Sequence, residues 1–175
     1  MAKKKTNIKQ ISKFDGKLIK LFTRRERLPN GRQINLEMIE HPGAVLIVPF
    51  LDKECIVMLR QYRAVIGKYI YELPAGTLGK NEKHLVCARR ELMEETGYSA
   101  ATMTKIGEIY PAPGYTTEKI VIFRAQDLQK NAASPEKDEI ITEKILTLTQ
   151  IRRLFKEKKI VDAKTICALA FCGLF

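Results

Sequence analysis

Runs of apolar residues along the chain predict most of its strands. Segments 44–51 and 54–63 are rich in Val, Ile and Leu, which is typical of buried strands, and a tight turn at 52–53 joins them. Residues 17–40 have the pattern of two strands around a turn, marked by Pro, Asn and Gly at 29–31. Further strands are expected at 68–74, on both sides of a Pro/Gly loop at 111–114, and at 140–148.

A central helix is expected over Lys83–Thr96. Asn81 is a candidate N-cap, and Gly97 marks the C-terminal end because glycine readily takes the left-handed conformation found there. On a helical wheel one side carries small and aliphatic residues and would pack on a sheet. These residues are Leu85, Ala88 and Leu92.

Two more helices are expected near the C-terminus. One covers 149–159 and would turn Leu154 and Phe155 inward, and the other covers 162–175 and begins with Asp162 as its cap. The chain therefore has strands first, one central helix, further strands and two final helices. This order predicts an α/β or α+β sandwich.

Length and composition fit one globular domain. The chain has 175 residues, 45% hydrophobic and 29% charged, and no apolar run reaches the ~18 residues of a transmembrane helix. The basic N-terminus has no apolar core behind it, so no secretory signal is expected. Four cysteines without a CxxC pair indicate reduced thiols, as in a cytoplasmic protein. We expect a basic tail at 1–15 and the domain at 16–175.

The net charge of +11 indicates an anionic ligand. Nucleic acid and a smaller anion such as a nucleotide both fit this charge. The basic segments 3–5, 23–27 and 152–159 do not interleave aromatic with basic residues, as a surface for single strands would. A nucleotide is therefore favoured over nucleic acid.

Carboxylates accumulate near the C-terminal end of the central helix. Glu91 and Glu95 are four residues apart, and Arg90 and Glu94 form a second such pair beside them. A helix C-terminus carries partial negative charge and like charges repel at this spacing, so the arrangement requires a compensating cation. Oxygen ligands favour a hard cation, Mg²⁺ or Mn²⁺.

These residues belong to a longer motif. Gly76, five residues, Glu82, seven residues and then REL-x-EE-x-GY at 90–98 resemble the complete box of the Nudix hydrolases, Gx5Ex7REUxEExGU. We call residues 76–98 the box. Tyr98 departs mildly from the usual aliphatic residue. The resemblance implies the Nudix fold, mixed β-sheets sandwiched between α-helices, and hydrolysis of a nucleoside diphosphate linked to another moiety.

The resemblance also implies roles within the box. Glu91 and Glu95 would bind the metal, Glu94 would bind it directly or through a bound water, and Arg90 would orient a box glutamate. The backbone carbonyl of Ala75 would complete the metal site. Glu82 would assist from the surroundings of the metal.

Segments outside the box resemble the ADP-ribose pyrophosphatase branch. They are EHPGAV at 40–45, RQYR at 60–63, ELPAG at 72–76 and PAPGYTTE at 111–118. The implied substrate is ADP-ribose or another nucleoside diphosphate sugar. Three alternatives stay open: hydrolysis of GDP-mannose, removal of pyrophosphate from RNA ends, and a non-catalytic module that binds a nucleotide and regulates a partner.

Candidate substrate residues come from the same segments. Arg63 or Arg60 would touch phosphate or sugar, because arginine grips a diphosphate with two parallel hydrogen bonds, and Gln61 lies between them. Glu118 would either fix a substrate hydroxyl or end a strand. Pro113 lies where the branch typically carries a proline, and shaping the loop is its other interpretation.

The catalytic base is expected in the acidic loop SPEKDEIIT at 134–142. Glu139, directly before a strand, is the first choice and Glu136 the second, with a merely solvated loop as the alternative. The branch is commonly homodimeric, with N-terminal strands exchanged. Residues 17–40 fit this arrangement, since an isolated hairpin is only marginally stable.

Overall fold

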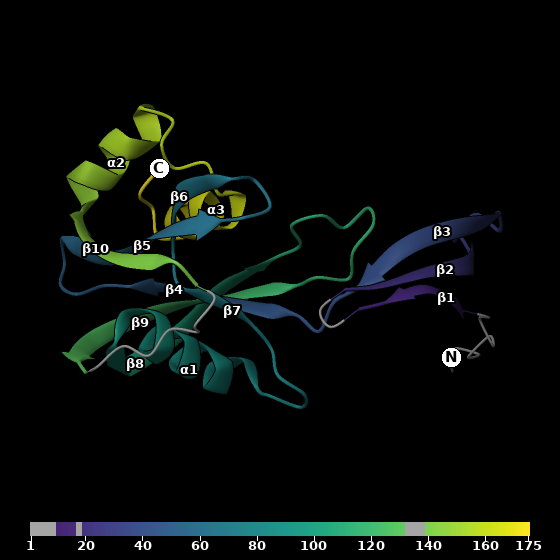
Figure 1. Ribbon diagram of the computed structural model, residues 1–175, viewed down its shortest axis with the longest axis horizontal. Coiled ribbons are helices and arrows are strands. Elements are labelled where there is room, and N and C mark those ends of the chain that lie inside the picture. The colour runs from purple at the N-terminus through teal and green to yellow at the C-terminus, as the bar shows by residue number, and fades with distance from the viewer. Residues whose placement is uncertain (1–9, 17–18, 132–138) are drawn as a thin grey trace. The chain divides into compact units, whose positions relative to one another are not determined.

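The computed structural model describes residues 10–16, 19–131 and 139–175. The chain forms two compact units. The first contains the residues up to Pro42 together with Ala112–Glu118, and the second contains Gly43–Pro111 and Lys119–Phe175. The second unit carries the box and every helix of the described residues (Figure 1).

The first unit is built on an antiparallel sheet in the order β1-β2-β3. Strands β2 (Lys20–Arg27) and β3 (Gln33–Glu40) confirm the two strands expected over 17–40, and Gly31 takes a left-handed φ of 84° in their turn. Strand β1 (Gln10–Asp15) lies where a basic tail was expected. A register shift between Ser12 and Phe14 breaks its alternation, which explains why the pattern did not predict a strand.

The second unit contains two sheets. The four-stranded sheet has the order β7-β4-β9-β8, with β4 and β9 parallel and the other pairs antiparallel. The three-stranded sheet has the order β10-β5-β6 and is antiparallel. The strands are β4 (Ala44–Pro49), β5 (Cys55–Arg63), β6 (Lys68–Glu72), β7 (Ala75–Thr77), β8 (Tyr98–Ile109), β9 (Ile120–Lys130) and β10 (Ile141–Thr147).

The turn at 52–53 connects strands of two different sheets and does not form a hairpin within one sheet. Strand β4 belongs to the four-stranded sheet and β5 to the three-stranded sheet. The Asp52 carboxylate accepts the backbone N–H groups of Glu54 and Cys55, both at 2.7 Å, which stabilises the turn. The apolar pattern predicted both strands but carries no information on which sheet each one joins.

Strand β4 is buried on both faces, as its continuous apolar run predicted. Val45 and Ile47 pack with the helix α1 (His84–Thr96), while Leu46 and Val48 pack on the other side with residues of α2 (Leu148–Lys156) and α3 (Ala163–Phe171). Figure 1 shows α1 on one side of the four-stranded sheet and α3 on the other. Mixed sheets between helices are the architecture expected from the sequence.

The predicted C-terminal end of α1 is confirmed, and the predicted N-cap is wrong. Gly97 ends the helix with a φ of 70°, as expected. Asn81 is not the cap. Lys83 holds the N-cap position without a side-chain hydrogen bond, and Asn81 takes a left-handed φ of 62° in the preceding turn.

Two residues expected in the core are more exposed than predicted. Leu85 is 42% exposed, because α1 starts at His84 and its burial begins only one turn later, at Cys87. Phe155 is 37% exposed and stacks on Phe175, whereas Leu154 is buried as expected. Asp162 caps α3 as predicted, accepting the Thr165 N–H at 2.9 Å. Within the described ranges no helix is long and apolar enough to cross a membrane.

Candidate active site

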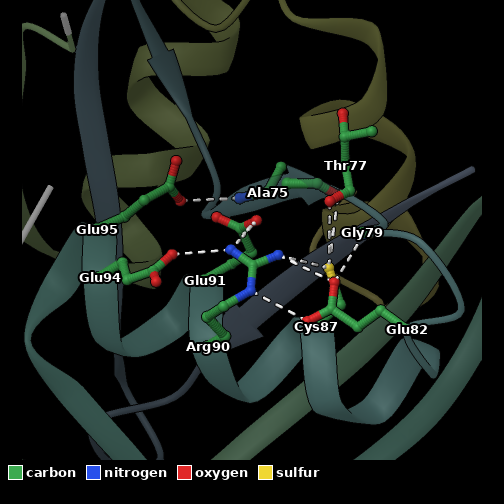
Figure 2. Close-up of polar contacts among 10 residues, drawn as sticks. Ala75, Thr77, Gly79, Glu82, Cys87, Arg90, Glu91, Glu94 and Glu95 are labelled. Carbon is green, nitrogen blue, oxygen red and sulfur yellow. Dashed lines mark hydrogen bonds and ion pairs between the residues drawn. The ribbon is translucent and has the colours of Figure 1, made fainter. Parts of the chain in front are cut away.

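In the C-terminal half of α1, Glu91 and Glu95 lie against the short strand β7, which precedes the helix, and Glu94 points toward Arg90 (Figure 2). Arg90 lies among them. Its Nη1 is 2.7 Å from Glu91 and 2.8 Å from Glu94, while Nε and Nη2 donate to Glu82 at 3.0 and 3.1 Å. One guanidinium therefore holds three carboxylates of the box in place.

Gly76 allows α1 to come this close to β7. A Cβ atom at this position would overlap the Glu91 carboxylate, both its carbon and Oε1. Only a residue without a side chain leaves the Glu91 head group in its observed place. Glycine is thus required at position 76 because the Glu91 carboxylate lies against its backbone.

Glu95 is the most deeply buried carboxylate of the box, with 6% of its surface exposed. Its Oε2 accepts the Ala75 N–H at 2.9 Å. Burial, and then the charges of Glu91 and Glu139, raise its pKa to about 8, against the opposing effects of the Ala75 hydrogen bond and of Arg63. Ionising Glu95 at neutral pH therefore requires a further positive charge.

Two further carboxylates of the box, Glu82 and Glu91, have perturbed pKa values, and both contact Arg90. Hydrogen bonds from Arg90 and from the Gly79 N–H lower the pKa of Glu82 to about 2, so Glu82 stays ionised. Burial raises the pKa of Glu91 in spite of Arg90, and the charges of Glu94 and Glu139 add to this effect. The cluster is negative beyond what Arg90 compensates.

Glu139 approaches the box from the loop before β10. Its charge raises the pKa of both Glu91 and Glu95, so the structure brings this loop carboxylate near the α1 cluster. Glu136, the second choice for a base, lies outside the described residues. Glu139 is therefore the acidic-loop residue for which the structure gives a position.

The donor set fits a hard divalent ion. Glu91, Glu94 and Glu95 offer only oxygen atoms, and two of them have raised pKa values because negative charge is crowded there. Among residues 10–16, 19–131 and 139–175 no group of His, Cys, Asp or Glu is arranged as a ready metal cluster. Arg90 is engaged with two of these carboxylates, which explains this arrangement.

Of the residues in RQYR, Arg63 is the one that reaches the box. Its charge opposes the rise of the Glu95 pKa, and its Nη2 lies 2.8 Å from Glu72. Arg60 stacks on the Tyr69 ring at 4.5 Å instead. Gln61 is only 4% exposed, within β5.

The two candidates from PAPGYTTE belong to the first unit. Pro113 and Glu118 lie in the segment Ala112–Glu118, in which Thr116 forms a bridge with Ile39 of β3. Glu118 Oε1 is 4.0 Å from His41 Nε2. Within its unit this segment is therefore anchored to β3.

Sequence reasoning missed two lysines that support the site. Lys130, from β9, donates to the Thr96 carbonyl at 3.0 Å and lies 4.1 Å over the Tyr98 ring, so a cation sits at the negative end of α1. Lys164, from α3, lies 2.6 Å from the buried Glu72. Both come from elements distant in sequence, so local spacing gave no signal for them.

With the site described, its class follows from comparison. A model of the NUDIX domain matches residues 40–169, and this chain belongs to that family. A crystal structure of an ADP compounds hydrolase has a TM-score of 0.79 at 24% identity and covers 95% of this chain and 90% of its own. The resemblance of the box and the expected fold are therefore both confirmed.

Two relatives match over nearly the whole chain. The ADP-ribose pyrophosphatase of Bacillus subtilis (strain 168) is 36% identical over 163 residues, which is 92% of this chain and 88% of the relative. The methanol dehydrogenase activator of Bacillus methanolicus is 39% identical over 169 residues, 95% of this chain and 91% of the relative.

Proposed function

We propose that this protein hydrolyses the pyrophosphate bond of ADP-ribose or a related nucleoside diphosphate sugar, giving a nucleoside monophosphate and a sugar phosphate. The observation that carries the proposal is the crowded carboxylate cluster of α1, with buried Glu95 beside β7 and Glu139 near it. The likeness to a protein named ADP-ribose pyrophosphatase supports the substrate class.

Glu91, Glu94 and Glu95, with the Ala75 carbonyl, would hold a divalent ion, Mg²⁺ or Mn²⁺. Such an ion neutralises diphosphate charge and lowers the pKa of bound water. Arg90 keeps Glu91 and Glu94 oriented at 2.7 and 2.8 Å. The raised pKa of Glu95 fits a residue whose charge is balanced only when a cation is bound.

Glu139 would accept the proton of the attacking water. A general base must come within hydrogen-bond reach of the water, and the position of Glu139 near Glu91 and Glu95 supports this role. Glu136 is the second candidate for the base.

Arg63 would bind the substrate diphosphate, since a guanidinium matches phosphate oxygens in a planar fork. Its proximity to Glu95 supports this assignment over Arg60, which faces Tyr69. Glu118 stays a candidate for binding a substrate hydroxyl. Pro113 stays a candidate for substrate contact or for shaping the loop at 111–114. Gln61, buried in β5, would support the strand that carries Arg63.

A second candidate function is regulation of a partner protein. The 39% identity to a methanol dehydrogenase activator favours it. Catalysis and regulation differ in one observable: a purely regulatory module binds nucleotide without turnover. The complete box, with each acidic residue in place, favours an enzyme.

The test is phosphate release, coupled to a phosphatase, from a panel of substrates with and without Mg²⁺. The panel contains ADP-ribose, GDP-mannose, UDP-glucose, a dinucleoside polyphosphate and a triphosphorylated RNA. We expect Mg²⁺-dependent turnover that is fastest with ADP-ribose. Fastest turnover of another member would keep the chemistry and reject the substrate, and no turnover of any would reject the enzyme.

A further inference from the structure

Outside the box, a buried carboxylate contacts Arg63, the residue proposed to bind the substrate diphosphate. Glu72, at the end of β6, is 2% exposed and contacts two cations. Arg63 meets Glu72 Oε2 with Nε and with Nη2, both at 2.8 Å. Lys164, in the first turn of α3, lies 2.6 Å from Oε1 and 2.8 Å from the N-cap residue Asp162.

The two cations divide the carboxylate between them. Arginine commonly takes both oxygens of a carboxylate in a two-pronged contact. Here Lys164 holds Oε1, and Arg63 directs two of its donor groups, Nε and Nη2, to Oε2. Removing the lysine would open Oε1 to the guanidinium, which would then shift to take both oxygens. Lys164 thus sets the place of Arg63.

The place of Arg63 matters to the site described above. Its charge reaches Glu95, one of the carboxylates proposed to bind the metal. A guanidinium has five N–H donors, and the contact with Glu72 uses two of them. The rest are available to orient phosphate oxygens, provided that the group stays where Glu72 holds it.

The same turn of α3 also fixes the backbone that leads into the box. Thr165 Oγ1 accepts the Leu73 N–H at 3.0 Å, and both Thr165 and Glu72 are buried. Residues 73–75 continue from there to the Ala75 N–H that binds Glu95. The first turn of α3 therefore contacts both Glu72, through Lys164, and the backbone of Leu73, through Thr165.

We propose that Lys164 is a positioning residue for substrate binding, which acts through Glu72 to hold Arg63 where it meets the diphosphate. This inference rests on the proposed function, because it requires a diphosphate ligand at the box. It adds a determinant from α3, which lies far along the chain from the box.

The test measures the Kd of ADP-ribose by calorimetry in a chelator, so that binding is read without turnover. Lys164→Met should raise Kd about tenfold to a hundredfold, the effect of losing one charge-assisted hydrogen bond to phosphate. Lys164→Gln, which keeps a donor to Oε1, should retain most of the affinity. Lys159→Met, which removes an exposed lysine paired with Glu157, is the control for net charge. Lys164→Ala, which also removes the donor to Oε1, replaces the Met variant if that variant does not fold.

A double-mutant cycle separates positioning from plain structural support. In an Arg63→Met background, Lys164→Met should weaken binding no further. An unchanged Kd in Lys164→Met, or an equal loss with and without Arg63, would overturn the inference alone. A wild-type protein that neither binds ADP-ribose nor cleaves any member of the panel would overturn the proposed function as well.

Discussion

At the scale of single residues, the site is a balance of charges. Arg90 compensates Glu82, Glu91 and Glu94, and Lys130 compensates the end of the helix. Burial raises the pKa of both Glu91 and Glu95, and the pKa of the more deeply buried Glu95 rises to about 8. We infer that the buried Glu95 lowers the stability of the metal-free fold, and that a bound cation would offset this cost.

Replacing Glu95 should therefore stabilise the metal-free protein. The folded carboxyl, with a pKa of about 8, keeps its proton where the unfolded carboxyl, near its ordinary 4.5, has lost it. The cost is absent below about pH 4.5, grows with pH and is complete above about pH 8. In a chelator, Glu95→Gln should thus unfold at a higher Tm than wild type at pH 9, with a smaller difference at pH 5. A lower Tm at pH 9 would contradict this.

A second prediction at this scale concerns the base. Glu139→Gln should lower kcat by about 10²–10⁴ with little change in KM, because only proton transfer is lost. Glu136→Gln is the matched control from the same loop and should keep nearly the full rate. The opposite result, a slow Glu136→Gln and a fast Glu139→Gln, would assign the base to Glu136.

At the scale of elements, the C-terminal end of α1 positions the last carboxylates of the box. Gly97 ends the helix with a φ of 70° and passes the chain directly into β8. Its N–H bonds to the Met93 carbonyl at 2.8 Å, and its own carbonyl accepts the Asn131 N–H at 2.6 Å. The last turn, with Glu94 and Glu95, is thus fixed at both backbone groups of Gly97.

Gly97→Ala should lower the free energy of unfolding by about 1–2 kcal/mol, the cost of a left-handed residue with a Cβ atom. Gly97→Asn should cost less, because asparagine tolerates this conformation better. Urea unfolding of the three proteins measures the difference. Equal stability of all three would show that the left-handed conformation does not constrain the end of α1.

The elements also show what a sequence can predict. Because helical spacing is local, the sequence predicted that Glu91, Glu94 and Glu95 lie close together. The apolar run 44–51 likewise predicted a strand buried on both faces. Lys130 and Lys164 were missed because their contacts depend on how distant elements pack. The exposed Leu85 has a related cause: a helical wheel does not show where along α1 the packing begins.

At the scale of the whole molecule, the exposure of the N-terminal strands bears on whether the protein forms a dimer. Strands β2 and β3 contain no fully buried side chain, and Phe14 beside them is 58% exposed. A sheet of three strands without a packed face has little stability alone. We expect a homodimer in which residues 17–40 pack on the partner.

Light scattering over a range of concentrations should then give twice the 20.0 kDa of one chain. Ile19→Ser removes an exposed apolar side chain from residues 17–40, and it should shift the protein toward smaller species. A mass of one chain at every concentration would contradict the dimer. It would leave the catalytic proposal untouched, because the box lies within the second unit.

The central claim is that the carboxylates of α1 carry pyrophosphate hydrolysis. Its most direct test is AMP release from ADP-ribose by wild type and by Glu95→Gln, each with Mg²⁺ and with a chelator. We predict that wild type releases AMP only with the divalent ion, and that the folded Glu95→Gln variant loses most of this rate. AMP release by Glu95→Gln at the wild-type rate, or by wild type in the chelator, would contradict the account.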